Sequence, residues 1–172
     1  WAVAASLVIL FFCIPKGHMV EKDLANGTHL KVVYDRDSYY GNIKVVDYSY
    51  GPRHTRELLI DGLLQGAVDM QSGLSLLSYP YLLDSIPTAI SPGGKNALVI
   101  GTGAGVIPAS FESKGITTDV VDIDQQVVDV ARKYFGFAIS GEVVIEDGRY
   151  FLATHQKQYD YIILDVFGGD TT

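Results

Sequence analysis

The sequence is poor in cysteine, in basic residues and in histidine. One Cys among 172 residues excludes a disulfide-stapled fold and any Cys-rich zinc module. The four histidines are scattered without the spacing of metal ligands, so we expect no metal. The chain has 13 Lys plus Arg and 20 Asp plus Glu, a net charge of −7. We expect no nucleic-acid partner, because neutralising phosphates requires clustered cations. A neutral or cationic small substrate fits this balance better.

The charges are also unevenly distributed. Residues 1–94 carry 9 acidic and 7 basic side chains, whereas residues 95–172 carry 11 and 6. A chain of this length can form one domain with a core, or one domain plus a small appendage. We therefore expect the acidic second half to hold the functional carboxylates.

Residues 1–15 contain no charged side chain. They are fewer than the roughly 20 residues that a helix needs to cross the hydrocarbon layer. Trp1 and the Pro15-Lys16 exit are typical of a membrane interface, so we expect the end of a transmembrane helix that anchors a catalytic domain on the cytoplasmic side. The alternatives are a buried strand or helix and a signal-peptide core, the last weakened by the lack of a basic leader.

Residues 16–90 are predicted to form a small antiparallel β domain. Three short apolar or alternating runs, 30–34, 42–50 and 55–60, are separated by turn-forming residues. The Leu-rich stretch 62–87 is predicted to be partly helical, with interruptions at Pro80 and Pro87.

Residues 91–172 are predicted to form an α/β domain. Apolar runs at 96–101, 119–123, 142–146 and 159–166 predict strands, and the segments after the first three predict helices. Such alternation builds a parallel, doubly wound sheet of the Rossmann type. The first predicted helix starts near Val106 and stops before Gly115.

A glycine loop occupies the first strand-to-helix turn. Gly101, Gly103 and Gly105 allow a tight turn and a close approach of a ligand to the backbone, although a simple tight turn would use glycine too. Asp122 and Ile123 end the next strand, where a carboxylate can accept hydrogen bonds from ribose hydroxyls. The loop therefore predicts a nucleoside site.

The spacing of these glycines favours an adenosyl-sulfonium ligand over a dinucleotide. A dinucleotide fingerprint would place Gly or Ala where this chain has Val106. Glu146, Asp147 and Gly148 follow the third strand, where an acid can receive the adenine amino group.

The fourth strand ends at Asp165, which we expect to point into the same crevice. Asp160, Asp165 and Asp170 stand in a stretch without a basic residue. A pocket of this kind would attract an amine and could take up the proton that the amine loses on attacking a carbon atom. The alternative is a helix cap or a surface acid.

From about Tyr34 onward the sequence resembles the spermidine synthase family, the polyamine aminopropyltransferases. The resemblance is carried by blocks in the family's order, which are residues 38–45, 59–65, 101–105, 122–124, 147–148 and 159–165. It implies an N-terminal β domain ahead of a class I methyltransferase-like fold.

The resemblance also implies an activity and roles for named residues. The aminopropyl group of decarboxylated S-adenosylmethionine would pass to putrescine or a related amine. Asp165 matches the acid that assists deprotonation of that amine, Asp122 the ribose ligand and Asp147 the adenine contact. Gln65 and Tyr79 match substrate-facing positions of the family. Tyr40 could line the same pocket, and Asp170 lies two residues after the position of a further family Asp.

Three positions depart from the family pattern, with Ala104 in place of the loop acid, Gly168 in place of an Asp, and Gly41 in place of a Gln. Two alternative functions therefore stay open: an S-adenosylmethionine-dependent methyltransferase, and an inactive nucleoside-binding homologue in a membrane assembly. Because a class I methyltransferase-like sheet has more strands than the four found here, we expect the domain to be incomplete at its C-terminal end. We also expect a homo-oligomer formed through the β domain.

Overall fold

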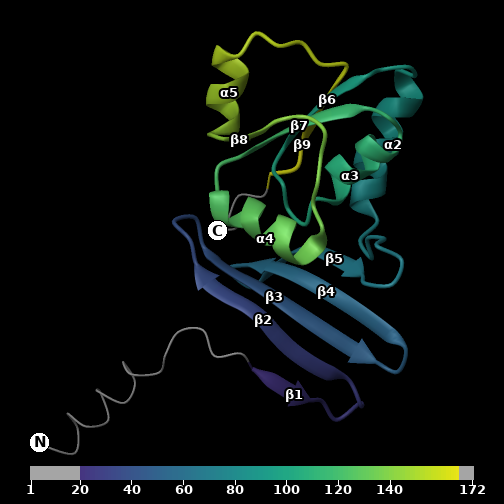
Figure 1. The fold of residues 1–172 in the computed structure, drawn as a ribbon, viewed down its shortest axis with the longest axis vertical. Coiled ribbons are helices and arrows are strands. Elements are labelled where there is room, and N and C mark those ends of the chain that lie inside the picture. Colours follow the sequence, from purple (N-terminus) through teal and green to yellow (C-terminus); the bar gives the residue numbers. More distant parts are fainter. Residues whose placement is uncertain (1–19, 167–172) are drawn as a thin grey trace, which may run out of the picture.

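The structure, a computed structural model, describes residues 20–166 and consists of two sheets with helices (Figure 1). The first is antiparallel, in the order β1-β2-β3-β4-β5. Its strands are β1 (Glu21–Asp23), β2 (His29–Asp37), β3 (Asn42–Tyr50), β4 (Arg53–Ile60) and β5 (Leu63–Asp69). The predicted strands 30–34, 42–50 and 55–60 are confirmed as β2, β3 and β4.

The prediction for residues 62–87 is only half right. The helix α2 (Tyr79–Ile90) is there, but the Leu-rich start of this stretch is the strand β5. Asp61 and Gly62 both have positive φ, 50° and 77°, as a two-residue hairpin turn requires, and they direct the chain back along β4. The prolines do not interrupt the helix either, because Pro80 lies in its first turn, where no backbone donor is needed, and Pro87 is accommodated inside it.

The second sheet is parallel, in the order β8-β7-β6-β9. Its elements alternate as predicted: β6 (Asn96–Ile100), α3 (Val106–Ser113), β7 (Thr117–Asp122), α4 (Gln125–Phe135), β8 (Val143–Ile145), α5 (Gly148–Thr154) and β9 (Tyr161–Leu164). The chain winds outward from β6 through β7 to β8 and then returns to place β9 on the other side of β6. This reversal opens a crevice at the carboxyl ends of β6 and β9, where ligands bind in open α/β sheets.

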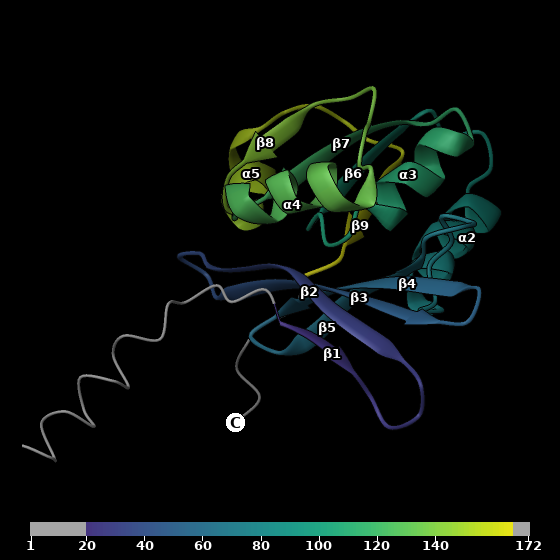
Figure 2. The ribbon, with the colours of Figure 1, turned by 60° about the horizontal axis from the view of Figure 1, so that its bottom comes forward.

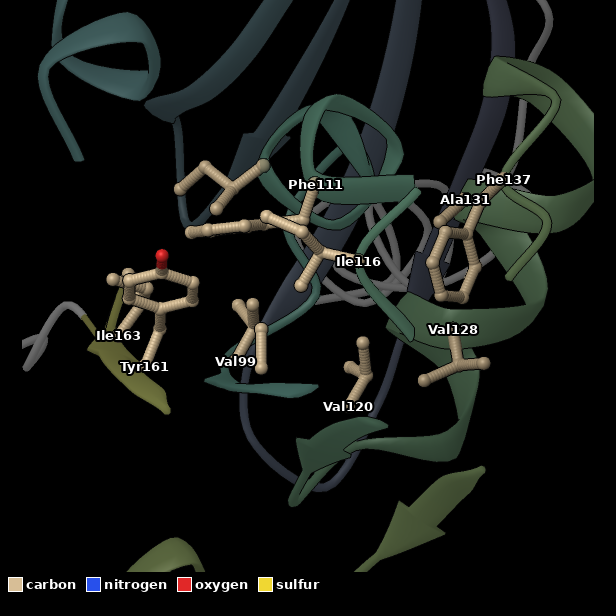
Figure 3. Packing of buried hydrophobic residues seen from close by; sticks show 11 residues of the cluster. Val99, Phe111, Ile116, Val120, Val128, Ala131, Phe137, Tyr161 and Ile163 are labelled. Atoms are coloured by element: carbon tan, nitrogen blue, oxygen red, sulfur yellow. The ribbon is translucent and has the colours of Figure 1, made fainter. Parts of the chain in front are cut away.

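Both faces of the parallel sheet are packed. On one face, Val99, Val120 and Ile163 meet Phe111 of α3 and Val128 of α4 (Figure 3). On the other face a smaller cluster joins Leu98, Ile100 and Val121 to Phe151 of α5. Burial on both faces explains why these strands read as continuous apolar runs.

Helix α4 lies between the two sheets (Figure 2). Its residues Val127 and Val130 are buried against Ile43, Val45 and Leu58 of the antiparallel sheet. The two halves of the chain therefore share an apolar core through α4, which fixes the antiparallel sheet beneath the crevice.

Polar contacts reinforce this junction. Arg56 donates from Nε and Nη2 to the two carboxylate oxygens of Asp47, at 2.6 and 2.7 Å, and from Nη1 to the carbonyl of Tyr134 at the end of α4, at 2.7 Å. One side chain of β4 thus bridges a strand of its own sheet and the helix above it.

Residues 1–15, for which a transmembrane helix is predicted, lie outside the described residues. Within residues 20–166, no helix combines the length and the apolar character needed to cross a membrane.

Candidate functional site

Three adjoining cavities follow the carboxyl edge of the parallel sheet. The largest, of about 640 Å³, is lined by Gly101, Asp122, Ile123, Asp147 and Gly148 among others. A second, of about 220 Å³, shares Gly101, Asp122 and Ile123 with it and adds Tyr40, Gln65 and Asp165. A third, of about 10 Å³, shares Gln65 and Asp165 with the second and adds Tyr79. Every predicted site residue within the described chain, apart from Gly105, therefore lines at least one of these three neighbouring cavities.

The glycine loop needs glycine for two separate reasons. Gly101, Gly103 and Gly105 have φ of 99°, 50° and 78°, in the left-handed region that L side chains rarely adopt. A Cβ on Gly101 would also lie 2.1 Å from the carbonyl oxygen of Asp165, and one on Gly105 would lie 2.8 Å from the ring of Phe137. Gly105 is the N-cap residue of α3 and lies next to the ring of Phe137.

Asp122 lies at the end of β7 and is only 9% exposed. Its carboxylate accepts from the backbone N–H of Thr102 at 2.7 Å and from that of Asp124 at 2.9 Å. Burial raises the pKa of Asp122, while these backbone donors act to lower it. The first donor ties the carboxylate to the glycine loop and holds it at the boundary of the two larger cavities.

Asp147 has a structural role that the sequence prediction did not include. Its Oδ1 accepts from the backbone N–H groups of Tyr150 and Arg149, at 3.2 and 2.8 Å, and so caps α5. These bonds lower the pKa of Asp147. A Cβ on the adjacent Gly148 would lie 2.4 Å from Ile100, so glycine permits the helix to start against β6. Asp147 therefore faces the largest cavity as an ionised helix cap.

Asp165 follows β9, and its backbone N–H donates to the carbonyl of Ile100 at 2.8 Å. Burial raises the pKa of its side chain to about 6. Within residues 20–166 no hydrogen-bond donor contacts this carboxylate. A half-buried carboxylate without a donor is poised to accept a proton from a bound ligand.

Tyr79 and Gln65 adjoin Asp165 from the first half of the chain. The hydroxyl of Tyr79, at the start of α2, donates to the carbonyl of Gln65 in β5 at 3.2 Å. Burial and the neighbouring charge of Asp165 raise the pKa of Tyr79 to about 12, so the phenol stays neutral. Tyr40 reaches the second cavity from the β2–β3 turn, and Asp170 lies outside the described residues.

Two departures from the family pattern have visible packing consequences. Ala104 is buried, and its methyl group packs against Gly66 of β5. A Cβ on Gly66 would lie only 2.6 Å from this methyl group. Gly41 has a φ of 148°, and a Cβ at this position would lie 2.6 Å from the carboxylate of Asp61. That carboxylate is held in place because it accepts a hydrogen bond from the backbone N–H of Asn42 at 2.8 Å. A Gln cannot occupy position 41 on this backbone. Gly168 lies outside the described residues.

Sequence reasoning missed Thr102 and placed Glu146 only as a neighbour of Asp147. Thr102 Oγ1 and Glu146 Oε2 are the only buried side-chain polar atoms among residues 20–166 without a hydrogen-bond partner, and both residues line the cavities. Glu146 Oε2 also lies 3.8 Å from His155 Nδ1. Buried polar atoms of a native protein are normally paired, so these two atoms are candidates for ligand contacts. Their positions inside or beside the motifs were the available signal. Within residues 20–166, no cluster of His, Cys, Asp and Glu is suited to hold a metal ion.

The parallel sheet, with its glycine loop and the acidic residues at its carboxyl edge, is that of a class I methyltransferase-like domain with a crevice at this edge. A family model described as the spermine/spermidine synthase domain matches residues 76–170, more than half of the chain. The chain therefore belongs to the spermine/spermidine synthase family.

Curated relatives agree with this membership. Polyamine aminopropyltransferase 1 of Aquifex aeolicus is 29% identical over 146 residues, which are 78% of this chain and 48% of that protein. The polyamine aminopropyltransferase of Alkaliphilus metalliredigens is 32% identical over 143 residues, 77% of this chain and 47% of that protein. The chain thus spans about half the length of these relatives. The N-terminal histidine N-methyltransferase of Emericella nidulans is 46% identical over 81 residues, 44% of this chain and 14% of that protein.

Solved structures support the fold. The spermidine synthase from Thermotoga maritima has a TM-score of 0.63 at 22% identity, covering 82% of this chain and 48% of that one. A probable spermidine synthase from Corynebacterium glutamicum has a TM-score of 0.67 at 17% identity, covering 81% and 53%. The predicted fold class, a small antiparallel sheet followed by a methyltransferase-like parallel sheet, is confirmed.

Proposed function

We propose that this domain transfers the aminopropyl group of decarboxylated S-adenosylmethionine to an amine such as putrescine. The observation that carries the proposal is Asp165, a half-buried carboxylate that no donor within residues 20–166 contacts, and which lines the same small cavity as Tyr79. Family membership supports the same reaction.

The nucleoside is proposed to lie along the largest cavity. Asp122 would accept from the ribose hydroxyls, for which its boundary position between the two larger cavities is suited. Glu146 and Asp147 line this cavity and not the second one, and there the adenine amino group would find carboxylate acceptors. Gly101, Gly103 and Ile123 would contact the nucleoside through backbone and apolar atoms.

The amine is proposed to enter through the second cavity, past Tyr40 and Gln65. The amine nitrogen attacks the methylene carbon next to the sulfonium. A C–N bond forms as the C–S bond breaks, and the electrons of the C–S bond remain on sulfur. The leaving group is methylthioadenosine. Asp165 takes the proton that the nitrogen loses. Its raised pKa, about 6, leaves it ionised near neutral pH yet more basic than an ordinary carboxylate. Tyr79 would border the reacting amine.

The experiment that tests this proposal is product analysis. The protein is incubated with decarboxylated S-adenosylmethionine plus putrescine or spermidine, and in parallel with S-adenosylmethionine. Methylthioadenosine and an aminopropylated amine are the expected products. S-adenosylhomocysteine with a methylated acceptor, or nucleoside binding without any product, would contradict the proposal.

Methyl transfer from S-adenosylmethionine is the second candidate. It is favoured by Ala104, which leaves the loop without its acid, and by the 46% identity of one segment to a histidine N-methyltransferase. Assembly through the antiparallel sheet and a membrane tether through residues 1–15 stay predictions, which sedimentation and membrane fractionation of the whole chain would test.

A further inference from the structure

Thr102 has an unusual environment within the crevice. It is 2% exposed, yet its hydroxyl has no hydrogen-bond partner within residues 20–166. Leaving a buried hydroxyl unpaired is energetically unfavourable. The residue belongs to the glycine loop, and its backbone N–H is already used by Asp122. The side chain is therefore free for a ligand that the backbone of the loop brings close.

The position of Thr102 indicates which part of a ligand it would meet. Thr102 lines the second and third cavities, together with Gln65 and Asp165, but not the largest one. The proposed base contacts, Glu146 and Asp147, line only the largest cavity, and Asp122 separates the two regions. A nucleoside with its base at Glu146 and its ribose at Asp122 would direct its 5′ substituent toward Thr102.

On this basis we propose that the Thr102 hydroxyl binds the amino group of the donor's alkyl tail. The inference rests on the proposed function, because it assumes an adenosyl donor in the largest cavity. It identifies a specificity-determining contact for the tail, distinct from the contacts that bind the nucleoside.

The charges around Thr102 favour an ammonium group over an anion. Asp165 shares both smaller cavities with it, and Asp122 accepts from its backbone. Hydrogen bonding by the Thr102 side chain is among the causes that act to lower the pKa of Asp122, so the hydroxyl lies close to that carboxylate, although the two do not form a well-aligned hydrogen bond. A hydroxyl that turns its hydrogen toward Asp122 presents its lone pairs to a donor in the cavity. The adjacent Ala104 offers no competing polar atom.

Thr102→Val and Thr102→Ser form a matched pair of variants. Valine keeps the branched shape and loses the hydroxyl, whereas serine keeps the hydroxyl. Because the hydroxyl forms no well-aligned hydrogen bond within residues 20–166, the valine variant is expected to unfold within a few degrees of the wild type. Any loss of binding would then reflect the ligand contact and not damage to the fold.

Calorimetric titration of the full chain with two ligands tests the assignment. Decarboxylated S-adenosylmethionine carries the aminopropyl tail, and methylthioadenosine is the same nucleoside without it. We expect Thr102→Val to weaken binding of the first about 10- to 100-fold and to leave the second unchanged, with Thr102→Ser close to the wild type.

Each alternative result has a definite meaning. Equal weakening of both ligands would place the hydroxyl at the ribose, acting through Asp122, and would overturn the inference. Unchanged affinity for both would also overturn it, while the proposed reaction could still be observed by product analysis. If the wild type binds neither ligand, the proposed function fails together with the inference.

Discussion

The carbonyl oxygen of Asp165 lies against the backbone of Gly101, only 2.1 Å from the position that a Cβ on Gly101 would take. The backbone N–H of Asp165 meanwhile donates to the carbonyl of Ile100. The ends of β6 and β9 are thus joined at the point where the sheet order reverses. This contact places the proposed proton acceptor directly over the glycine loop.

Replacement of Gly101 by Ala is expected to disrupt the site. The new methyl would collide with the Asp165 carbonyl, and the φ of 99° would add backbone strain of about 1–3 kcal/mol. We expect a lower unfolding temperature and loss of nucleoside binding, measured by thermal unfolding and titration. Gly62→Ala is the control, because its φ is 77° but nothing lies within 4 Å of a Cβ there. Equal effects of the two variants would show that strain alone, and not the contact with Asp165, explains the result.

Arg56→Lys is expected to loosen the junction between the antiparallel sheet and α4. Lysine cannot reproduce the paired bonds to Asp47 together with the bond to the carbonyl of Tyr134. We expect a destabilisation of about 1–3 kcal/mol, seen as a lower denaturant midpoint. Arg53→Lys, at an exposed position, should leave the midpoint nearly unchanged. A midpoint unaffected by Arg56→Lys would mean that the apolar cluster alone holds the junction.

Asp165 is expected to make stability depend on pH. Its pKa in the folded protein, about 6, lies above the ordinary value of 3.8, so the folded state favours the protonated form. The wild type should therefore lose stability as pH rises from about 4 through about 6. Asp165→Asn removes this dependence and should be more stable than the wild type at pH 7, with a smaller difference at pH 4.

Asp160 provides the opposite case for the same unfolding experiment. Backbone donors from Lys95 and Asn96 lower its pKa, so its contribution is present at neutral pH and lost on acidification. Asp160→Asn should thus be destabilising at pH 7 and nearly neutral in acid. Parallel pH profiles for the two variants would contradict the assigned environment of Asp165.

The parallel half of the fold was predictable because its signals are local. The run 97–100 is apolar on both faces, 119–123 contains an apolar Val pair, and glycines or acids mark where each strand ends. The same local order explains why Gly101, Asp122, Asp147 and Asp165 could be assigned to one edge, since the carboxyl ends of parallel strands share that edge.

The features that were missed depend on contacts between distant segments. Strand β5 was interpreted as part of a Leu-rich helix, although Asp61-Gly62 is a strong hairpin signal. The unpaired hydroxyl of Thr102 depends on the approach of β5 and β9 to the loop, which no short pattern encodes. The capping role of Asp147 became evident only once the start of α5 was known.

The most direct test of the account compares turnover and binding for the wild type and Asp165→Asn at pH 8. If Asp165 accepts the proton of the attacking amine, the variant should form methylthioadenosine about 10²- to 10⁴-fold more slowly and bind the nucleoside with unchanged affinity. Wild-type activity should in addition rise with pH through about 6, as this carboxyl ionises. A variant that turns over at the wild-type rate would contradict the catalytic role of Asp165, and a wild type that forms no methylthioadenosine would contradict aminopropyl transfer itself.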